Sequence, residues 1–383
     1  MSADDARAAD GAARRPLVVK IGSSTLTTAD NRIDRAYLRE VAAQLARVRA
    51  AGWAPIVVTS AAIACGLEAL GIERRPDDMP SLQAAASVGQ SALSAAYAEA
   101  FAPHGIVTSL VLLTRRDTAD RSAYLHARDT FDRLLDLGVV PIVNENDTVS
   151  VEQIRFGDND TLAALVACLV DAELVVILSD IDGLYDANPR RVPTARLIER
   201  VEAIDAGILS VAGEAGSAAG SGGMVTKVKA ARVLMVAGIP LVICHGRRAG
   251  AIEDAAAGRA VGTLFCASAR PHEITPKKLW IALGDAARGS LSVDDGAKSA
   301  LIERGSSLLA VGVRRVAGSF RAGDIVDILD GAGHLFARGR VSADSDEVEL
   351  AEGLDQKTLA GNRLLAHLAD RPLVHRDELV VFE

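Results

Sequence analysis

Six short runs rich in Val, Ile and Leu alternate with longer stretches of helical spacing between Leu17 and about residue 265. Because the runs are apolar at consecutive positions, we interpret them as strands buried on both faces. Repeated alternation of strand and helix is typical of a parallel sheet with helices on both sides. The sequence therefore predicts an α/β domain in which helices sandwich an open, mainly parallel sheet. The six runs are LVVKIG (17–22), PIVVTS (55–60), VTSLVLLT (107–114), VVPIVNEND (139–147), LVVILSD (174–180) and PLVICHG (240–246).

A second domain is predicted from the length of the chain and from a change of pattern after residue 266. A chain of 383 residues exceeds what one hydrophobic core usually supports. The segment 267–278 is polar, contains proline and is interpreted as a linker. Beyond it, strand-like pieces separated by glycine turns predict a small β-rich domain over residues 279–383. The α/β domain is then expected over residues 16–266, after a disordered tail over residues 1–15.

Two helix boundaries are predicted in detail. Apolar residues recur at helical spacing from Tyr37 to Val48, and Gly52 is expected to end that helix. Asp120 is expected to cap the helix that carries Phe131.

Composition disfavours several classes of protein. The first fifteen residues lack the apolar segment of a signal peptide, and no apolar run approaches the roughly 20 residues that cross a bilayer. We therefore expect a cytoplasmic protein without a membrane partner. The formal net charge of −8 gives no support to a mainly electrostatic grip on nucleic acid. The four cysteines lie far apart, so we expect reduced thiols and neither a disulfide framework nor a zinc site.

Polar and glycine-rich segments follow four of the predicted strands. In open α/β sheets, ligands bind beyond the carboxyl ends of the strands. Each segment alone is an ordinary turn, but several on one edge of a sheet favour a ligand site. The segments are Gly22-Ser23-Ser24, Thr59-Ser60, Asn144-Glu145-Asn146-Asp147 and Ser179-Asp180.

Two lysines are candidates for binding a phosphate group. Lys20 lies inside the first strand, either facing solvent at a sheet edge or placing its ammonium beside a bound phosphate. Lys227 ends the segment 220–227, GSGGMVTK, which precedes a helix of small and apolar residues. Glycines and a helix N-terminus favour a bound anion, although a linker with a surface lysine fits the same pattern. The spacing of a Walker A loop is absent.

Acidic and amide side chains gather in two further segments. Asp158 or Asn159 could cap the helix that follows Gly157-Asp158-Asn159-Asp160. Together with the NEND segment at 144–147, the same residues could hold an amino-acid ammonium, orient the lysines and hold Mg²⁺, directly or through water. The segment after Ser179-Asp180 is either a connecting loop or a pocket for adenine and ribose.

This set of residues suggests phosphoryl transfer, which demands mainly positioning and charge neutralisation. A carboxylate acceptor has a pKa of about 4 and is already ionised at neutral pH, so it needs no general base. No histidine stands among the strand-end segments, and we interpret the histidines as structural.

The same segments resemble a known family. In order, VVKIGSSTL, VVTSAAIACG, PIVNENDTVS, FGDND, LSDIDGLYDANP and GSGGMVTK are similar to the motifs of glutamate 5-kinases of the amino acid kinase superfamily. The C-terminal string DDGAKSALIERGSSLLAVGVRRVAGSFRAGDIVDI resembles the PUA domain that bacterial members often append. The resemblance covers nearly the whole chain beyond residue 15, and it implies an amino acid kinase-like sheet followed by a PUA-like domain.

The resemblance also implies roles for individual residues. Lys20 and Lys227 are expected to stabilise the transition-state charge, and Asp160 to hold both lysines in place. We expect ATP with Mg²⁺ as the phosphoryl donor and L-glutamate as the acceptor. The expected glutamate contacts are Ser60, Asp147 and Asn159, with Asn144 and Asp158 close by. The expected ATP contacts are Ser179, Asp180, Ser221, Gly222, Gly223, Met224, Val225, Thr226 and Lys227; no individual residue is assigned as a metal ligand.

The activity implied by the resemblance is phosphorylation of the γ-carboxylate of L-glutamate, the first step of proline biosynthesis. Proline is implied as a feedback inhibitor. Assembly through the kinase domain as a homodimer or homotetramer is implied as well.

One residue departs from the family pattern. The family usually has Ser-Gly-Ala after the second strand, whereas this chain has Ser60-Ala61-Ala62. If the backbone at this position needs a positive φ, Ala61 would cost on the order of 1 kcal/mol or shift the glutamate site. If φ is negative, the methyl group is harmless.

Two alternative functions remain open at this point. The chain could be another amino acid kinase, acting on acetylglutamate, aspartate, carbamate or a nucleotide monophosphate. It could also bind RNA through the PUA-like domain. From Lys277 to Glu383, however, 14 basic residues face 17 acidic ones, which disfavours RNA as a partner.

Overall fold

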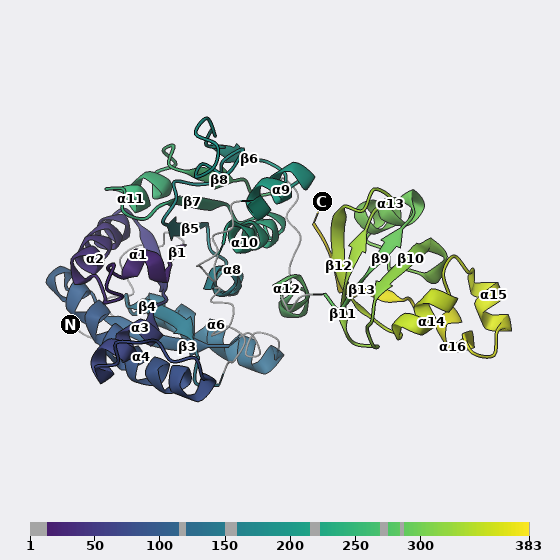
Figure 1. The fold of residues 1–383 in the computed structure, drawn as a ribbon, viewed down its shortest axis with the longest axis horizontal. Coiled ribbons are helices and arrows are strands. Elements are labelled where there is room, and N and C mark those ends of the chain that lie inside the picture. The colour runs from purple at the N-terminus through teal and green to yellow at the C-terminus, as the bar shows by residue number, and fades with distance from the viewer. Residues whose placement is uncertain are drawn as a thin grey trace.

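The computed structural model describes residues 14–114, 120–149, 159–214, 223–268, 275–283 and 287–382. Its strands form two separate sheets, one of eight strands and one of five. Figure 1 shows the larger sheet with its helices in purple to green, and the smaller domain in green to yellow. The predicted fold class is thereby confirmed. The predicted domain boundaries stay a prediction; most of the predicted tail (1–13) and half of the predicted linker (269–274) lie outside the described residues.

All six predicted strands of the α/β domain are present and lie parallel to their neighbours in the order β3-β4-β2-β1-β5-β7. The short strand β8 pairs antiparallel with β7, and β6 pairs parallel with β8 at the edge. The strands are β1 (Arg15–Ile21), β2 (Trp53–Val58), β3 (Thr108–Leu113), β4 (Val140–Glu145), β5 (Leu174–Ser179), β6 (Arg200–Val201), β7 (Leu241–His245) and β8 (Thr263–Phe265).

Helices cover both faces of this sheet, because alternate strand residues belong to two different hydrophobic cores. In β1, Leu17 and Val19 pack with one helical layer, whereas Val18 packs with the other. The first layer contains α2 (Arg35–Ala50), α3 (Ala62–Leu70), α4 (Met79–Phe101) and α11 (Ala251–Ala256). The second contains α6 (Arg121–Asp136), α8 (Asn159–Leu169), α9 (Ala206–Glu214) and α10 (Met224–Val236). Two short helical turns, α1 (Ser23–Leu26) and η2 (Ala102–His104), join these elements.

Both detailed helix predictions are confirmed. Helix α2 ends just before Gly52, which has a φ of 91° that favours glycine. The side chain of Asp120 accepts a hydrogen bond of 2.8 Å from the backbone N–H of Ala123 and caps α6.

The smaller domain is built on a sheet with the order β10-β9-β11-β12-β13 and has a hydrophobic core of its own. Its strands are β9 (Gly289–Val293), β10 (Val313–Gly318), β11 (Ile325–Leu329), β12 (Leu335–Val341) and β13 (Val374–Val381). Helices α13 (Asp295–Arg304), α14 (Ser345–Leu350), α15 (Gln356–Gly361) and α16 (Ala366–Ala369) and the turn η3 (Ala310–Gly312) complete it.

Helix α12 (Pro276–Leu283) lies between the two domains (Figure 1). Its residues Leu279 and Ile281 share a core with the helices of the larger domain and with Ile325 and Val380 of the smaller one. The two sheets are therefore joined by a continuous apolar contact.

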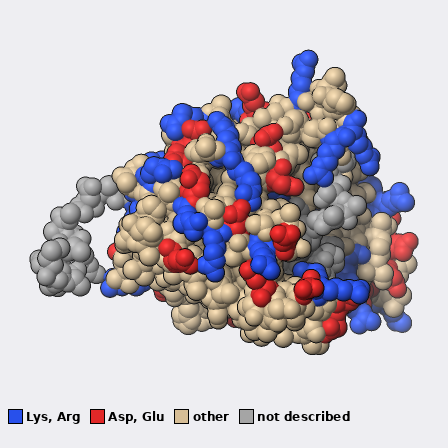
Figure 2. Space-filling model, turned by 60° about the vertical axis from the view of Figure 1, so that its left-hand side comes forward, with Lys and Arg blue, Asp and Glu red and all other residues tan. Residues whose placement is uncertain are grey.

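The distribution of surface charge and the state of the cysteines agree with what the composition predicts. Lys/Arg and Asp/Glu side chains are interspersed on the face shown in Figure 2. The four cysteines are free thiols. Within the part of the chain that the structure describes, no helix combines the length and apolar character needed to span a membrane.

Candidate active site

The carboxyl end of β1 places Lys20 inside the molecule. Val18 of the same strand faces the layer of α8 and α10, and Lys20, two residues later, faces the same way. Only 4% of Lys20 is exposed. Its ammonium lies 2.7 Å from Oδ1 of Asp160. A solvent-facing edge lysine is therefore excluded.

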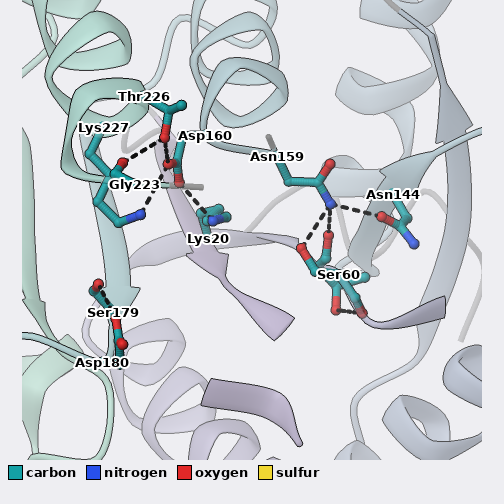
Figure 3. A network of polar contacts seen from close by, with 11 residues as sticks. Lys20, Ser60, Asn144, Asn159, Asp160, Ser179, Asp180, Gly223, Thr226 and Lys227 are labelled. Atoms are coloured by element: carbon teal, nitrogen blue, oxygen red, sulfur yellow. Dashed lines mark hydrogen bonds and ion pairs between the residues drawn. The ribbon is translucent and has the colours of Figure 1, made fainter. Parts of the chain in front are cut away.

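Asp160 joins two lysines at the start of α8. Its carboxylate is fully buried, and its Oδ2 lies 3.1 Å from the ammonium of Lys227. The hydroxyl of Thr226 donates to the same oxygen at 2.7 Å and also lies 2.8 Å from the carbonyl oxygen of Gly223. Figure 3 shows Lys20 and Lys227 approaching Asp160 from two sides. The three charged groups carry a net charge of one positive unit.

The two lysines hold the carboxylate of Asp160 in its ionised state. Burial alone would raise the pKa of Asp160, but the ammonium groups of Lys20 and Lys227 outweigh it and lower the pKa to about 2. Asp160 is thus an anion at neutral pH, and a carboxylate with so low a pKa is a weak base. Its evident effect is to fix the two cations.

The glycine-rich segment leads directly into α10. Gly223 precedes the first helical residue with an extended backbone, and Lys227 lies in the first turn with 6% exposure. A surface lysine is therefore excluded here as well. Met224 packs in the hydrophobic core, and Val225 is partly exposed at 37%. Ser221 and Gly222 lie outside the described residues.

A second polar cluster lies beside the carboxyl ends of β2 and β4. The side-chain amide nitrogen of Asn159 is 2.9 Å from the hydroxyl of Ser60 and 2.9 Å from Oδ1 of Asn144, and it also contacts the carbonyl oxygen of Thr59. Asn159 is the first residue of α8, so it does not act as a simple helix cap. Its side chain instead connects two strand-end segments, Thr59-Ser60 and the segment that begins at Asn144 (Figure 3).

Gln90 was not predicted from the sequence to belong to this cluster. It lies on α4 with 6% exposure, accepts from the amide of Asn144 at 3.2 Å and donates to the carbonyl of Glu145 at 3.1 Å. Helical spacing aligns Gln90 with the buried residues Ala86, Leu93 and Tyr97 of the same helix. A glutamine at a position on the apolar face of this helix was the sequence signal that could have indicated a buried polar contact.

Asp147 lines the same cavity as Ser60 and Asn144. Burial raises its pKa to about 6, against a smaller opposing effect of the positive charge of Arg75. A partly buried carboxylate whose charged form is disfavoured by burial is stabilised by a cation that binds beside it. Asp158 lies outside the described residues.

Ser179 ends β5, Asp180 follows it, and both line the other end of the cavity. The hydroxyl of Ser179 donates to Oδ1 of Asp180 at 3.3 Å. Figure 3 shows both residues on the Lys227 side, away from Ser60 and Asn144. A single cavity of about 1250 Å³ connects the two ends past Lys20 and Lys227. That volume suits a nucleotide and a small second substrate together.

Ala61 has a left-handed backbone, with φ of 73° and ψ of 15°. It precedes α3 and lines the cavity between Ser60 and Ala62. The positive φ means that alanine in place of the usual glycine has an energetic cost here, since a side chain at this φ costs about 1 kcal/mol.

Comparison with known proteins agrees with this geometry. The amino acid kinase family matches residues 15–245, and the PUA domain matches residues 289–359. A glutamate 5-kinase of Anaeromyxobacter dehalogenans is 47% identical over 370 residues, 96% of each chain. Glutamate 5-kinases of Geobacter sulfurreducens and Streptomyces coelicolor are 45% and 47% identical, over 95% and 98% of this chain and 97% and 98% of their own. The chain therefore belongs to the amino acid kinase family, and within it to the glutamate 5-kinases.

Proposed function

We propose that this protein transfers the γ-phosphoryl group of ATP to the γ-carboxylate of L-glutamate and forms γ-glutamyl phosphate, the first step of proline biosynthesis. The observation that carries the proposal is the convergence of Lys20 and Lys227 on Asp160 midway along the cavity. The names of the relatives support glutamate as the acceptor, rather than acetylglutamate, aspartate, carbamate or a nucleotide monophosphate.

The reaction needs charge stabilisation and no proton transfer. An oxygen of the γ-carboxylate attacks the γ-phosphorus, the bond from that phosphorus to the β,γ-bridging oxygen breaks, and ADP leaves with the electron pair. Lys20 and Lys227 stabilise the negative charge on the transferring group, and Asp160 holds them in position beforehand. The acceptor is ionised at neutral pH, so no group has to remove a proton from it.

The cavity's two ends suit the two substrates. Asp147 would hold the α-ammonium of glutamate, with Ser60, Asn144, Asp158 and Asn159 around the amino acid. ATP would lie against Ser179, Asp180 and the segment 221–227, where the N-terminus of α10 favours a phosphate group. Within the described residues, no group of three or more His, Cys, Asp or Glu side chains could hold a metal. Mg²⁺ would neutralise phosphate charge and would be held chiefly by the phosphate oxygens of ATP and by water.

The remaining parts of the proposal come from the family resemblance. They are feedback inhibition by proline, assembly of the kinase domain as a homodimer or homotetramer, and a cytoplasmic location. Inhibition by millimolar proline and sedimentation analysis would test the first two.

The reaction is tested by trapping the acyl phosphate with hydroxylamine. Purified protein is incubated with Mg²⁺-ATP and, in parallel, with L-glutamate, L-aspartate, N-acetylglutamate, carbamate or UMP, and ADP is measured in each reaction. Glutamate is expected to give the fastest ADP formation and an equal amount of γ-glutamyl hydroxamate. Faster turnover of another acceptor, or ADP without hydroxamate, would refute the proposal.

The left-handed residue Ala61 yields a prediction about substrate affinity. Ala61→Gly removes a strained methyl group from the acceptor end of the cavity, so the KM for glutamate is expected to fall. Ala62→Gly is the matched control, since Ala62 is the first residue of α3 and gains no such relief. The KM values of both variants are compared with wild type at saturating ATP. An unchanged or higher KM for Ala61→Gly would remove any role for this methyl group.

Asp147 yields a prediction about pH. Only its ionised form attracts the α-ammonium of glutamate, and its pKa is raised to about 6. The KM for glutamate is therefore expected to rise by up to about tenfold for each pH unit below 6. In Asp147→Asn the KM should be high throughout and should lose this dependence. A wild-type KM that stays constant from about pH 7 to pH 5 at saturating ATP would contradict the assignment.

A further inference from the structure

Among the residues that the structure describes, four cationic side chains line the cavity: Lys20, Arg32, Arg75 and Lys227. Lys20 and Lys227 are held by Asp160 at the point where the phosphoryl group would be transferred. Arg32 and Arg75 are exposed, and neither guanidinium makes a hydrogen bond or ion pair with another described residue. Two arginines at the cavity are therefore not explained by the phosphoryl-transfer cluster.

Of these two arginines, only Arg75 changes the pKa of Asp147, which lies at the end of the cavity that we assign to glutamate. The charge of Arg75 lowers the pKa of Asp147, which places the two groups within Coulombic reach of each other. Arg32 has no such effect on Asp147. Arg75 belongs to the connection between α3 and α4, whereas Arg32 belongs to the connection between α1 and α2.

A free α-amino acid carries an ammonium and a carboxylate on the same carbon atom. The acceptor end offers a matching pair of opposite charges in Asp147 and Arg75. The cavity lining also includes the carboxylates of Asp30, Glu68, Glu73 and Asp180, each of which would repel a carboxylate. A guanidinium can bind a carboxylate with two parallel hydrogen bonds, which fixes its orientation as well as its charge.

We propose that Arg75 binds the α-carboxylate of the amino-acid substrate, while Asp147 binds its α-ammonium. This assignment rests on the proposed function and extends it to specificity: the enzyme selects an acceptor with a free α-carboxylate. Glutamate whose α-carboxylate is an amide or is joined in a peptide bond is then a poor substrate, because a neutral group replaces the anion opposite Arg75.

The test compares L-glutamate with L-glutamic acid α-amide, which keeps the ammonium and the γ-carboxylate. Hydroxamate formation is measured for wild type, Arg75→Ala and Arg75→Lys at saturating ATP. Arg74→Ala is the matched control, because Arg74 is the exposed neighbour that does not line the cavity. Arg32→Ala tests the rival arginine. Thermal unfolding of each variant verifies that the fold is retained.

For Arg75→Ala, kcat/KM with glutamate is expected to fall about 10- to 100-fold, mainly through KM, since a charged hydrogen-bond pair is lost. With the α-amide, kcat/KM should change less than about twofold. Arg75→Lys should recover part of the loss, and Arg74→Ala and Arg32→Ala should resemble wild type with both substrates.

Three results would overturn the assignment. Arg75→Ala could affect both substrates equally or neither, or Arg32→Ala could produce the loss that is specific for glutamate. Failure of the proposed reaction itself has a different signature: wild type would form no hydroxamate from glutamate, and the Arg75 assignment would fall with it.

Discussion

Lys227→Ala is expected to lower kcat by about 10²–10³-fold, because it removes one of two cations that stabilise charge on the transferring phosphoryl group. The KM for glutamate should change far less, since Lys227 lies away from Ser60 and Asn144 (Figure 3). Initial rates of ADP and hydroxamate formation at saturating substrates measure the effect.

The fold should survive this substitution. Asp160 keeps its contact of 2.7 Å with Lys20 and its hydrogen bond from Thr226, so no buried charge is left without a partner. Lys229→Ala is the matched control, because Lys229 is exposed on the same helix. A Lys227→Ala enzyme with near-normal kcat would show that this lysine has no part in the chemistry.

Asp160→Asn is expected to abolish activity and to destabilise the protein by about 3–5 kcal/mol, since it leaves two buried ammonium groups without their anion. Asparagine preserves the size of the side chain, so the loss reports charge rather than packing. Urea unfolding monitored by circular dichroism gives the free energy of unfolding. Asp129→Asn, at an exposed position of α6, should cost less than about 1 kcal/mol.

A double variant separates the charge effect from any other defect of Asp160→Asn. Replacing Lys227 by Met in the Asp160→Asn background removes one unpaired cation, so it should restore part of the lost stability. If Lys227→Met instead lowers the free energy of unfolding of the Asp160→Asn protein further, the attraction between Asp160 and the lysines is not what stabilises this cluster.

The strands of the α/β domain were predictable because burial on both faces gives a continuous apolar run. The strands that were missed lack this signal. β6 and β8 have two and three residues, and β13 mixes exposed and buried residues in VHRDELVV. In the smaller domain, the strand-like segment SLSVDD (290–295) is a strand only in its first part: β9 ends at Val293, and Asp294 caps α13 with a hydrogen bond of 2.7 Å from Ala297.

The candidate site was predictable at the level of segments, since the carboxyl ends of parallel strands meet at one edge of a sheet. The geometry of single side chains was not. The sequence left Asn159 as a possible helix cap, whereas its amide connects Ser60 and Asn144. The sign of φ at Ala61 depends on the path of the backbone into α3. The functional interest of Arg75 comes from its electrostatic effect on Asp147, which the sequence does not show. Such contacts are made by the tertiary fold, not by local pattern.

The central claim is that the γ-carboxylate of glutamate attacks the phosphorus beside Lys20 and Lys227. Glutamate labelled with oxygen-18 in both γ-carboxylate oxygens tests it directly, with ATP as donor and hydroxylamine present to attack the carbonyl carbon of the product. Mass spectrometry of the released phosphate should find one labelled oxygen in each molecule, transferred from the carboxylate. Phosphate without label would mean that water, rather than glutamate, accepts the phosphoryl group.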